Sequence, residues 1–233
     1  MGRKFKPSVA ILASGSGSTA EAFIHATQAE YGAIGAQVEV VVCNRPRGKA
    51  GVYDRIDRLN KLYGLDIDVA YISNMTHPGG ELARGQTLAE SEAICQLAVD
   101  RGVAHVALMG YMRIVTGSLV DEFGWRPNQH QSIYEARMTN THPGPLPETV
   151  DTFGINTSAR VLEIGMGTSR HTVHLVAPGV DRGPIIAEHP VEIIQGEGAQ
   201  DLFERVQVVE KTGLPYVLDR FLREQEAYYN CNS

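Results

Sequence analysis

Residues 8–20 read SVAILASGSGSTA, and this stretch decides the fold of the first half of the chain. Ser8–Ala13 is short and apolar, which favours a buried strand, and residues 18–28 then follow a helical pattern. A turn rich in glycine and serine joins the two. A strand that enters a helix through such a turn is typical of α/β proteins that bind phosphate groups.

The same alternation continues along the chain. Short apolar runs predict strands at Gln37–Cys43, 68–72 and 103–109, and helical patterns predict helices at 49–63 and 85–101. This rhythm predicts an α/β, Rossmann-like, doubly wound fold with a mostly parallel sheet. We expect its active site at the carboxyl ends of the parallel strands.

The second half follows a different pattern. Residues 126–135 are polar and predict a loop, whereas 170–177 and 185–194 predict two strands that pair antiparallel through a turn at 178–183. A helix is expected at 200–211, where Gly213 would stop it, and Pro215 would begin a final helix that reaches about residue 225. The sequence therefore predicts one α/β unit with an antiparallel C-terminal portion.

Composition limits the partners. The 233-residue chain has a net charge of -6, which argues against a nucleic-acid backbone as its ligand. Its three cysteines are far apart and predict neither disulfides nor a metal site. No apolar run approaches the ~18 residues of a membrane span. We expect a cytoplasmic protein with small-molecule ligands. The sequence allows a homodimer but does not decide the oligomeric state.

The glycine-rich turn is a candidate anion site. Glycines let the backbone approach a ligand closely, and the N-terminus of the following helix offers free N–H groups to a phosphate. The residues concerned are Gly15, Ser16, Gly17, Ser18 and Thr19. The turn also fits a dinucleotide fingerprint, but no acidic residue ends the second strand. Arg45 and Arg47 could instead hold a 2′-phosphate, so an NADP-dependent oxidoreductase remains an alternative.

Three polar residues further along suggest acid–base chemistry. Asn140 and His142 alternate in an extended segment and point the same way. An asparagine amide can donate to a developing oxyanion, and a histidine can carry a proton. Asp181 lies in an ordinary turn sequence and gains meaning only if the fold brings it to His142, where it would stabilise the imidazolium.

Several motifs occur in a fixed order between residues 9 and 222. They are Ser14–Ser18, Gly110–Val115, Asn140–Pro143, Val173-His174 followed by Asp181–Pro184, and Arg205–Gln207 followed by Glu210. In this order they resemble the folate-dependent formyltransferase family, in particular its members that formylate glycinamide ribonucleotide in purine synthesis.

The resemblance implies a role for each motif. Asn140, His142 and Asp181 would be catalytic, with Asn140 and His142 stabilising the oxyanion. The Gly15–Thr19 loop would hold the acceptor phosphate and Glu210 the ribose hydroxyls. The donor would be 10-formyltetrahydrofolate, and no metal ion would be needed. The donor's pterin pocket would be lined by Met112, Arg113, Ile114 and Val115. Residues 1–233 would then form a single domain, with a phosphate-binding half at 8–125 and a catalytic and folate-binding half at 126–233.

The chain departs from the family pattern after Pro147. The family has an aromatic-Pro-Gly stretch there and then paired histidines, whereas residues 148–157 read ETVDTFGINT. This region borders the acceptor. The second hypothesis is therefore a formyltransferase that acts on another small amine, such as an amino sugar nucleotide.

Overall fold

The structure, a computed structural model, describes residues 6–30, 34–79 and 85–232. Within these ranges the chain forms a seven-stranded sheet in the order β3-β2-β1-β4-β5-β6-β7. The strands from β3 to β5 pair in parallel, and β6 pairs antiparallel with β5 and β7. The predicted fold class is confirmed. The strands are β1 (Ser8–Ala13), β2 (Gln37–Cys43), β3 (Asp68–Tyr71), β4 (His105–Leu108), β5 (Met138–His142), β6 (Thr168–Leu175) and β7 (Ile185–Glu192).

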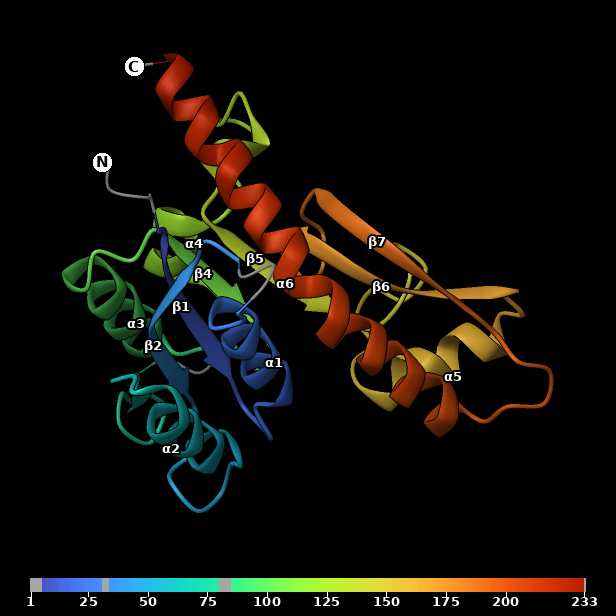
Figure 1. The fold of residues 1–233 in the computed structure, drawn as a ribbon. Coiled ribbons are helices and arrows are strands. Elements are labelled where there is room, and N and C mark those ends of the chain that lie inside the picture. Colours follow the sequence, from blue (N-terminus) through green and yellow to red (C-terminus); the bar gives the residue numbers. More distant parts are fainter. Residues whose placement is uncertain (1–5, 31–33, 80–84, 233) are drawn as a thin grey trace.

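Helices cover both faces of the sheet (Figure 1). Buried side chains of α1, α2 and α6 pack on one face, and those of α3 and α4 pack on the other. This arrangement is the doubly wound architecture that the sequence predicts. The helices are α1 (Ser18–Thr27), α2 (Val52–Tyr63), α3 (Leu88–Asp100), α4 (Gly117–Phe123), α5 (Ile155–Glu163) and α6 (Ala199–Asn232), with a 3₁₀ turn η1 (Ile133–Glu135).

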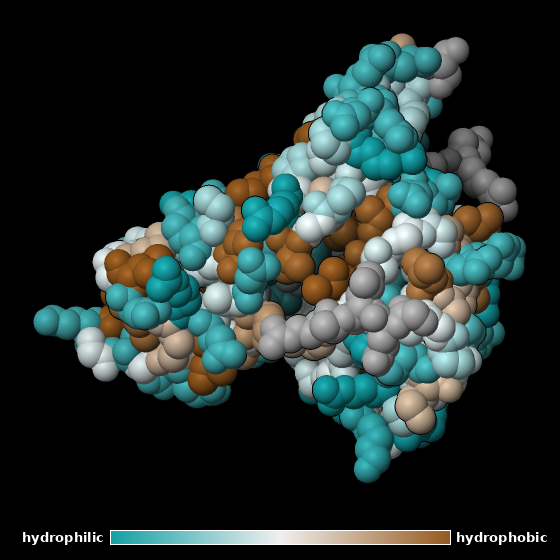
Figure 2. Space-filling model, turned by 180° about the vertical axis from the view of Figure 1, so that it is seen from behind, coloured by the Kyte–Doolittle hydropathy of each residue, from teal (hydrophilic) through white to brown (hydrophobic). Residues whose placement is uncertain are grey.

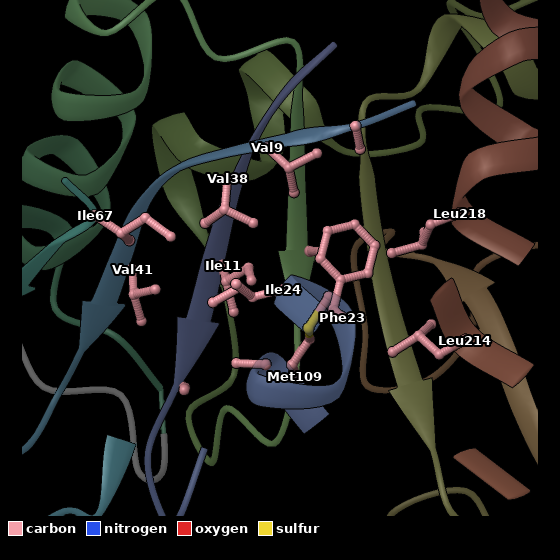
Figure 3. Packing of buried hydrophobic residues seen from close by; sticks show 14 of the residues in the cluster. Val9, Ile11, Phe23, Ile24, Val38, Val41, Ile67, Met109, Leu214 and Leu218 are labelled. Atoms are coloured by element: carbon pink, nitrogen blue, oxygen red, sulfur yellow. The ribbon is translucent and has the colours of Figure 1, made fainter. Parts of the chain in front are cut away.

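Strand β1 lies inside the sheet, between β2 and β4, and is buried on both faces. Val9 and Ile11 point to the face covered by α1, and Ala10 and Leu12 point to the opposite face. Figure 3 shows Phe23 of α1 directed toward the face of the sheet to which Val9 and Ile11 point. Burial on both sides explains why this strand is an uninterrupted apolar run rather than an alternating one.

The C-terminal helix differs from the prediction. We expected a stop at Gly213 and a new helix at Pro215, but α6 runs without a break from Ala199 to Asn232. Figure 1 shows it as one red ribbon that passes α5, β7 and α1. The expected break is wrong because tertiary contacts outweigh local propensity. The helix packs with Leu202 and Val206 into one cluster and with a second group into the main core, namely Leu214, Val217, Leu218 and Leu222.

Smaller differences lie at the edges of the predicted elements. Helices α4 and α5 have no counterpart in the prediction, and the 126–135 loop contains η1. Strands β4 and β5, on either side of the expected boundary at residue 125, pair within the same sheet. The division into two functional halves stays a prediction. No helix of the described residues is long and apolar enough to cross a membrane.

Gly213 gives a test of how α6 packs. A Cβ there would lie 2.8 Å from Cε1 of His189 on β7, whose ring also contacts His171 at 3.2 Å. Alanine normally stabilises a helix relative to glycine, by about 1 kcal/mol. We expect Gly213→Ala to lower the free energy of unfolding instead, by about 1–3 kcal/mol in urea denaturation.

The control is the same substitution in a His189→Ala background. With the ring removed, Gly213→Ala is expected to raise the free energy of unfolding. A stabilising effect in both backgrounds would show that the close packing of α6 on β7 is wrong.

Candidate active site

A cavity of about 610 Å³ lies at the carboxyl ends of the parallel strands. The loops after β1 and β4 meet there, at the point where the strand order reverses, which is where open α/β sheets bind ligands. Seen from behind, the surface is hollowed near its middle, and hydrophobic residues gather around the hollow (Figure 2). The lining includes Ser14–Thr19, Arg45, Leu108–Val115, Asn140–Pro143, Asp151–Gly154, His174, Gly179–Asp181, Phe203, Gln207 and Glu210.

The glycine-rich turn forms one wall of this cavity. Gly17 has a φ of 75° and precedes the first residue of α1, and a Cβ on it would lie 2.6 Å from the Val52 side chain. Only glycine fits that position without strain. A Cβ on Gly15 would meet nothing within 4 Å, so the backbone is open there. Gly17 has no side chain to cap the start of α1, and the Ser18 N–H makes only a long hydrogen bond, to Ser16 Oγ at 3.4 Å. The first-turn N–H groups can therefore meet an anion.

Glu210 lies beside this turn, as the resemblance implied. Thr19 Oγ1 donates a hydrogen bond to Glu210 Oε1 at 2.8 Å, and the Glu210 residue is only 8% exposed. Burial raises the pKa of the Glu210 carboxyl, although the Thr19 hydrogen bond and the Lys211 charge oppose this. Because the Thr19 hydroxyl proton is already used, an anion would meet the Thr19 backbone rather than its side chain.

Asn140, His142 and Asp181 converge on another part of the cavity lining. His142 Nδ1 lies 3.4 Å from Asp181 Oδ2, and Asn140 Nδ2 donates to Asp181 Oδ1 at 3.2 Å. Asn140 Nδ2 also lies 3.1 Å from His174 Nε2. The fold thus brings Asp181 next to His142, which is the arrangement that a catalytic role for Asp181 requires.

The sheet topology explains this convergence. Asn140 and His142 alternate along β5 and so share a face of the sheet. The antiparallel neighbour β6 places His174 opposite Asn140. The turn after β6 then returns the chain, and Asp181 sits in it with a φ of 51°, a left-handed conformation that aspartate tolerates.

Burial controls the charges of these groups. It lowers the pKa of His142 to about 4, even though the neighbouring Asp181 charge favours protonation. Burial would raise the pKa of Asp181, but the contacts with His174 and His142 and the Asn140 hydrogen bond lower it overall. At neutral pH the site therefore holds a carboxylate beside a neutral imidazole.

The Met112–Val115 segment also lines the cavity. Met112 N donates to Ser14 Oγ at 2.8 Å, which ties the segment to the glycine-rich turn. The Met112 residue is 53% exposed. The Arg113 guanidinium instead pairs with the buried Glu90 carboxylate at 2.8 Å. The segment thus offers backbone groups and apolar side chains to a ligand, and its folate role stays a prediction.

Other cavity residues were not assigned from the sequence. His174 and Gln207 lie within quoted motifs, so the signal was present but no role was given to them. Asp151–Gly154, within the stretch 148–157 that departs from the family pattern, also line the cavity. Of the two arginines proposed for a 2′-phosphate, Arg45 lines the cavity, whereas Arg47 pairs with Asp57 at 2.6 Å. Within residues 6–30, 34–79 and 85–232, no cluster of three or more His, Cys, Asp or Glu could hold a metal ion.

The model of the family described as Formyl transferase matches residues 8–218 of the chain. The chain belongs to the formyl transferase family. The resemblance found in the sequence is therefore confirmed, and enzymes of this family use folate-derived formyl donors.

Similar solved structures and similar curated proteins support this assignment to the family. The formyl transferase chain superimposes on glycinamide ribonucleotide transformylase 1 from Geobacillus kaustophilus with a TM-score of 0.75 and 29% identity, covering 94% of this chain and 100% of that one. For phosphoribosylglycinamide formyltransferase from Bacillus halodurans the TM-score is 0.72 at 29% identity, covering 92% and 95%. The trifunctional purine biosynthetic protein adenosine-3 of Drosophila pseudoobscura pseudoobscura is 31% identical over 210 residues, 90% of this chain. The chain spans only 13% to 18% of the length of such trifunctional relatives.

Three buried histidines make the stability of this formyl transferase depend on pH. Burial lowers the pKa of His142 to about 4 and those of His105 and His171 to about 3. The unfolded chain binds protons at these residues below about pH 6.5, whereas the folded chain does not. We expect the free energy of unfolding to fall by about 2 kcal/mol per histidine between about pH 7 and pH 5. The raised pKa of Glu210 acts in the opposite direction but is a single group.

Urea denaturation at the two pH values measures this difference. A His171→Gln variant serves as control, because it removes one of the three titrating groups and should reduce the pH dependence. Equal free energies of unfolding at both pH values in the wild type would contradict the prediction.

Proposed function

We propose that this chain transfers a formyl group from 10-formyltetrahydrofolate to the amine of glycinamide ribonucleotide, a step of purine synthesis. The observation that supports the proposal is that one cavity is lined both by the glycine-rich turn Gly15–Thr19 and by the Asn140, His142 and Asp181 cluster. The names of the Geobacillus and Bacillus relatives support the choice of acceptor.

The acceptor would lie along the wall formed by α1 and α6. Its phosphate would meet the backbone N–H groups of Gly15–Thr19, where the helix terminus favours negative charge. Glu210 would bind the ribose hydroxyls, since its carboxylate faces the cavity from α6. The pterin of the donor would lie against Met112–Val115. This arrangement brings the amine and the formyl group together near His142.

The chemistry follows from the charges of the cluster. The acceptor amine attacks the formyl carbon. The Asn140 amide then releases its contact with His174 Nε2 and donates that proton to the oxyanion that forms. The neutral His142 ring takes the proton released by the amine, and the Asp181 carboxylate stabilises the resulting imidazolium. As the bond from the formyl carbon to N10 of the folate breaks, the ring returns this proton to N10. The atoms and charges of the two substrates then equal those of the two products, and the scheme uses no metal ion.

The acceptor is the part of the proposal that needs its own test. Asp151–Gly154 line the cavity, and residues 148–157 lack the paired histidines of the family pattern. Another small amine, such as an amino sugar nucleotide, is therefore the second candidate acceptor. We further propose a cytoplasmic enzyme with small-molecule partners, in agreement with its net charge of -6.

The acceptor is tested with purified protein, 10-formyltetrahydrofolate and a panel of amines. We expect turnover with glycinamide ribonucleotide, and we expect Glu210→Ala to raise its KM about tenfold or more by removing contacts to the ribose. Glu204→Ala is the matched control, because Glu204 lies on the same helix and hydrogen-bonds Gln200 at 2.7 Å. Formylation of an amino sugar nucleotide, with no turnover of glycinamide ribonucleotide, would replace the proposed acceptor.

The catalytic cluster is tested by two substitutions. We expect His142→Ala to lower kcat by about 10²-fold or more, the usual effect of losing a proton-transfer group. Asp181→Asn keeps the shape but removes the charge that stabilises the imidazolium, so kcat should fall while KM changes little. Steady-state kinetics measures both. Wild-type kcat in the two variants would show that these residues are structural.

A further inference from the structure

Thr149 lies next to His142 but belongs to none of the motifs that carry the proposed function. It sits in the 148–157 stretch that departs from the family pattern, and it is 0% exposed. Its Oγ1 lies 2.9 Å from His142 Nε2. The ring of His142 therefore has a polar neighbour at each nitrogen, Thr149 at Nε2 and Asp181 at Nδ1.

The second hydrogen bond of Thr149 fixes the direction of the first. Thr149 Oγ1 lies 2.6 Å from the carbonyl oxygen of Pro145. A carbonyl oxygen has no proton, so the single proton of the hydroxyl must lie in this contact. The hydroxyl can then only accept a hydrogen bond from His142. His142 must therefore carry its proton on Nε2.

A proton on Nε2 leaves Nδ1 of the neutral ring without one. Nδ1 faces Asp181 Oδ2 at 3.4 Å, so two lone pairs meet there until Nδ1 takes a proton. Two other titratable groups, His174 and His171, lie nearby on β6. Besides burial, charge repulsion from His174 lowers the pKa of His142, and repulsion from His142 lowers the pKa of His171. Because Asp181 lies beside Nδ1, a proton that the neutral ring takes up there is stabilised by the carboxylate.

The turn that carries Thr149 is built to hold this hydroxyl in place. Thr149 N donates to Pro145 O at 3.1 Å, and Thr152 Oγ1 donates to Thr149 O at 2.6 Å. A Cβ on Gly144 would lie 2.7 Å from Thr149 Oγ1. Glycine at position 144 thus allows the hydroxyl to reach the buried ring.

We propose that Thr149 is a positioning residue that selects the Nε2-protonated tautomer of His142, so that the ring exchanges protons through Nδ1, beside Asp181. The proposal rests on the proposed function for the use of that proton, in which Nδ1 takes it from the attacking amine and gives it to N10. The tautomer itself is a property of the protein without substrate. It is the only neutral form in which Thr149 keeps both hydrogen bonds.

The first experiment reads the tautomer directly. Nitrogen-15 NMR of the ring, assigned by the signal lost in His142→Ala, is recorded at neutral pH without substrate. We expect Nε2 to carry the proton in the wild type and in Thr149→Ser, which keeps the hydroxyl. In Thr149→Val the proton should move to Nδ1, where it can bond to Asp181. A wild-type ring protonated on Nδ1 overturns the proposal without need of any variant.

The second experiment asks whether the tautomer matters for catalysis. We expect Thr149→Val to lower kcat at least about tenfold, with both KM values within about twofold of the wild type. The acidic limb of the kcat–pH profile should move to lower pH, because the imidazolium loses the acceptor for its Nε2 proton. Thr149→Ser should recover most of the activity.

The matched control is Thr27→Val, which also removes a hydroxyl that donates to a backbone carbonyl, that of Ile24 at 2.7 Å. It should leave kcat unchanged. Equal losses in Thr149→Val and Thr149→Ser, or an unmoved pH profile, would assign Thr149 a structural role only. If the protein formylates no acceptor, the proposed function fails, and the NMR experiment still decides the tautomer.

Discussion

The buried carboxylate of Asp181 is the interaction on which the rest of the site depends. It is 11% exposed at the side chain, and the cost of burying its charge is offset by contacts with Asn140, His142 and His174. These contacts exist because β6 runs antiparallel to β5 and the turn after it bends back over the strand ends. The change from parallel to antiparallel pairing is therefore what brings these polar side chains together at the strand ends. Replacing this carboxylate by a neutral group would leave His142 without a partner for its charged form.

Much of the fold was readable from the sequence because local pattern and tertiary packing agree there. Strand β1 matches its prediction at both ends, since burial on both faces requires an unbroken apolar run. The antiparallel pair of β6 and β7 was also predicted, with its connecting turn. The prediction failed at α6, where Gly213 and Pro215 suggested a break. Contacts of Leu214 and Leu218 with the core hold the helix together, and a single sequence does not reveal such contacts.

The site was readable only in part. Asn140 and His142 share one strand face, so their alternation predicted a common direction. Asp181 could be placed beside them only once the sheet topology was known. Thr149 left no signal, because its contact with His142 depends on the turn after Pro145 and on the room that Gly144 leaves. The acceptor side was the hardest part to predict, since residues 148–157 depart from the family pattern.

The path of the transferred carbon shows whether an amine is the group that attacks the formyl donor. The donor is labelled with ¹³C in its formyl group and mixed with the protein and excess glycinamide ribonucleotide, and the products are read by ¹³C NMR. The account predicts that the label appears as a formamide on the acceptor amine, one for each tetrahydrofolate released. Label released as free formate, with the acceptor unchanged, would contradict it, because water and not an amine would then be the group that attacks in this cavity.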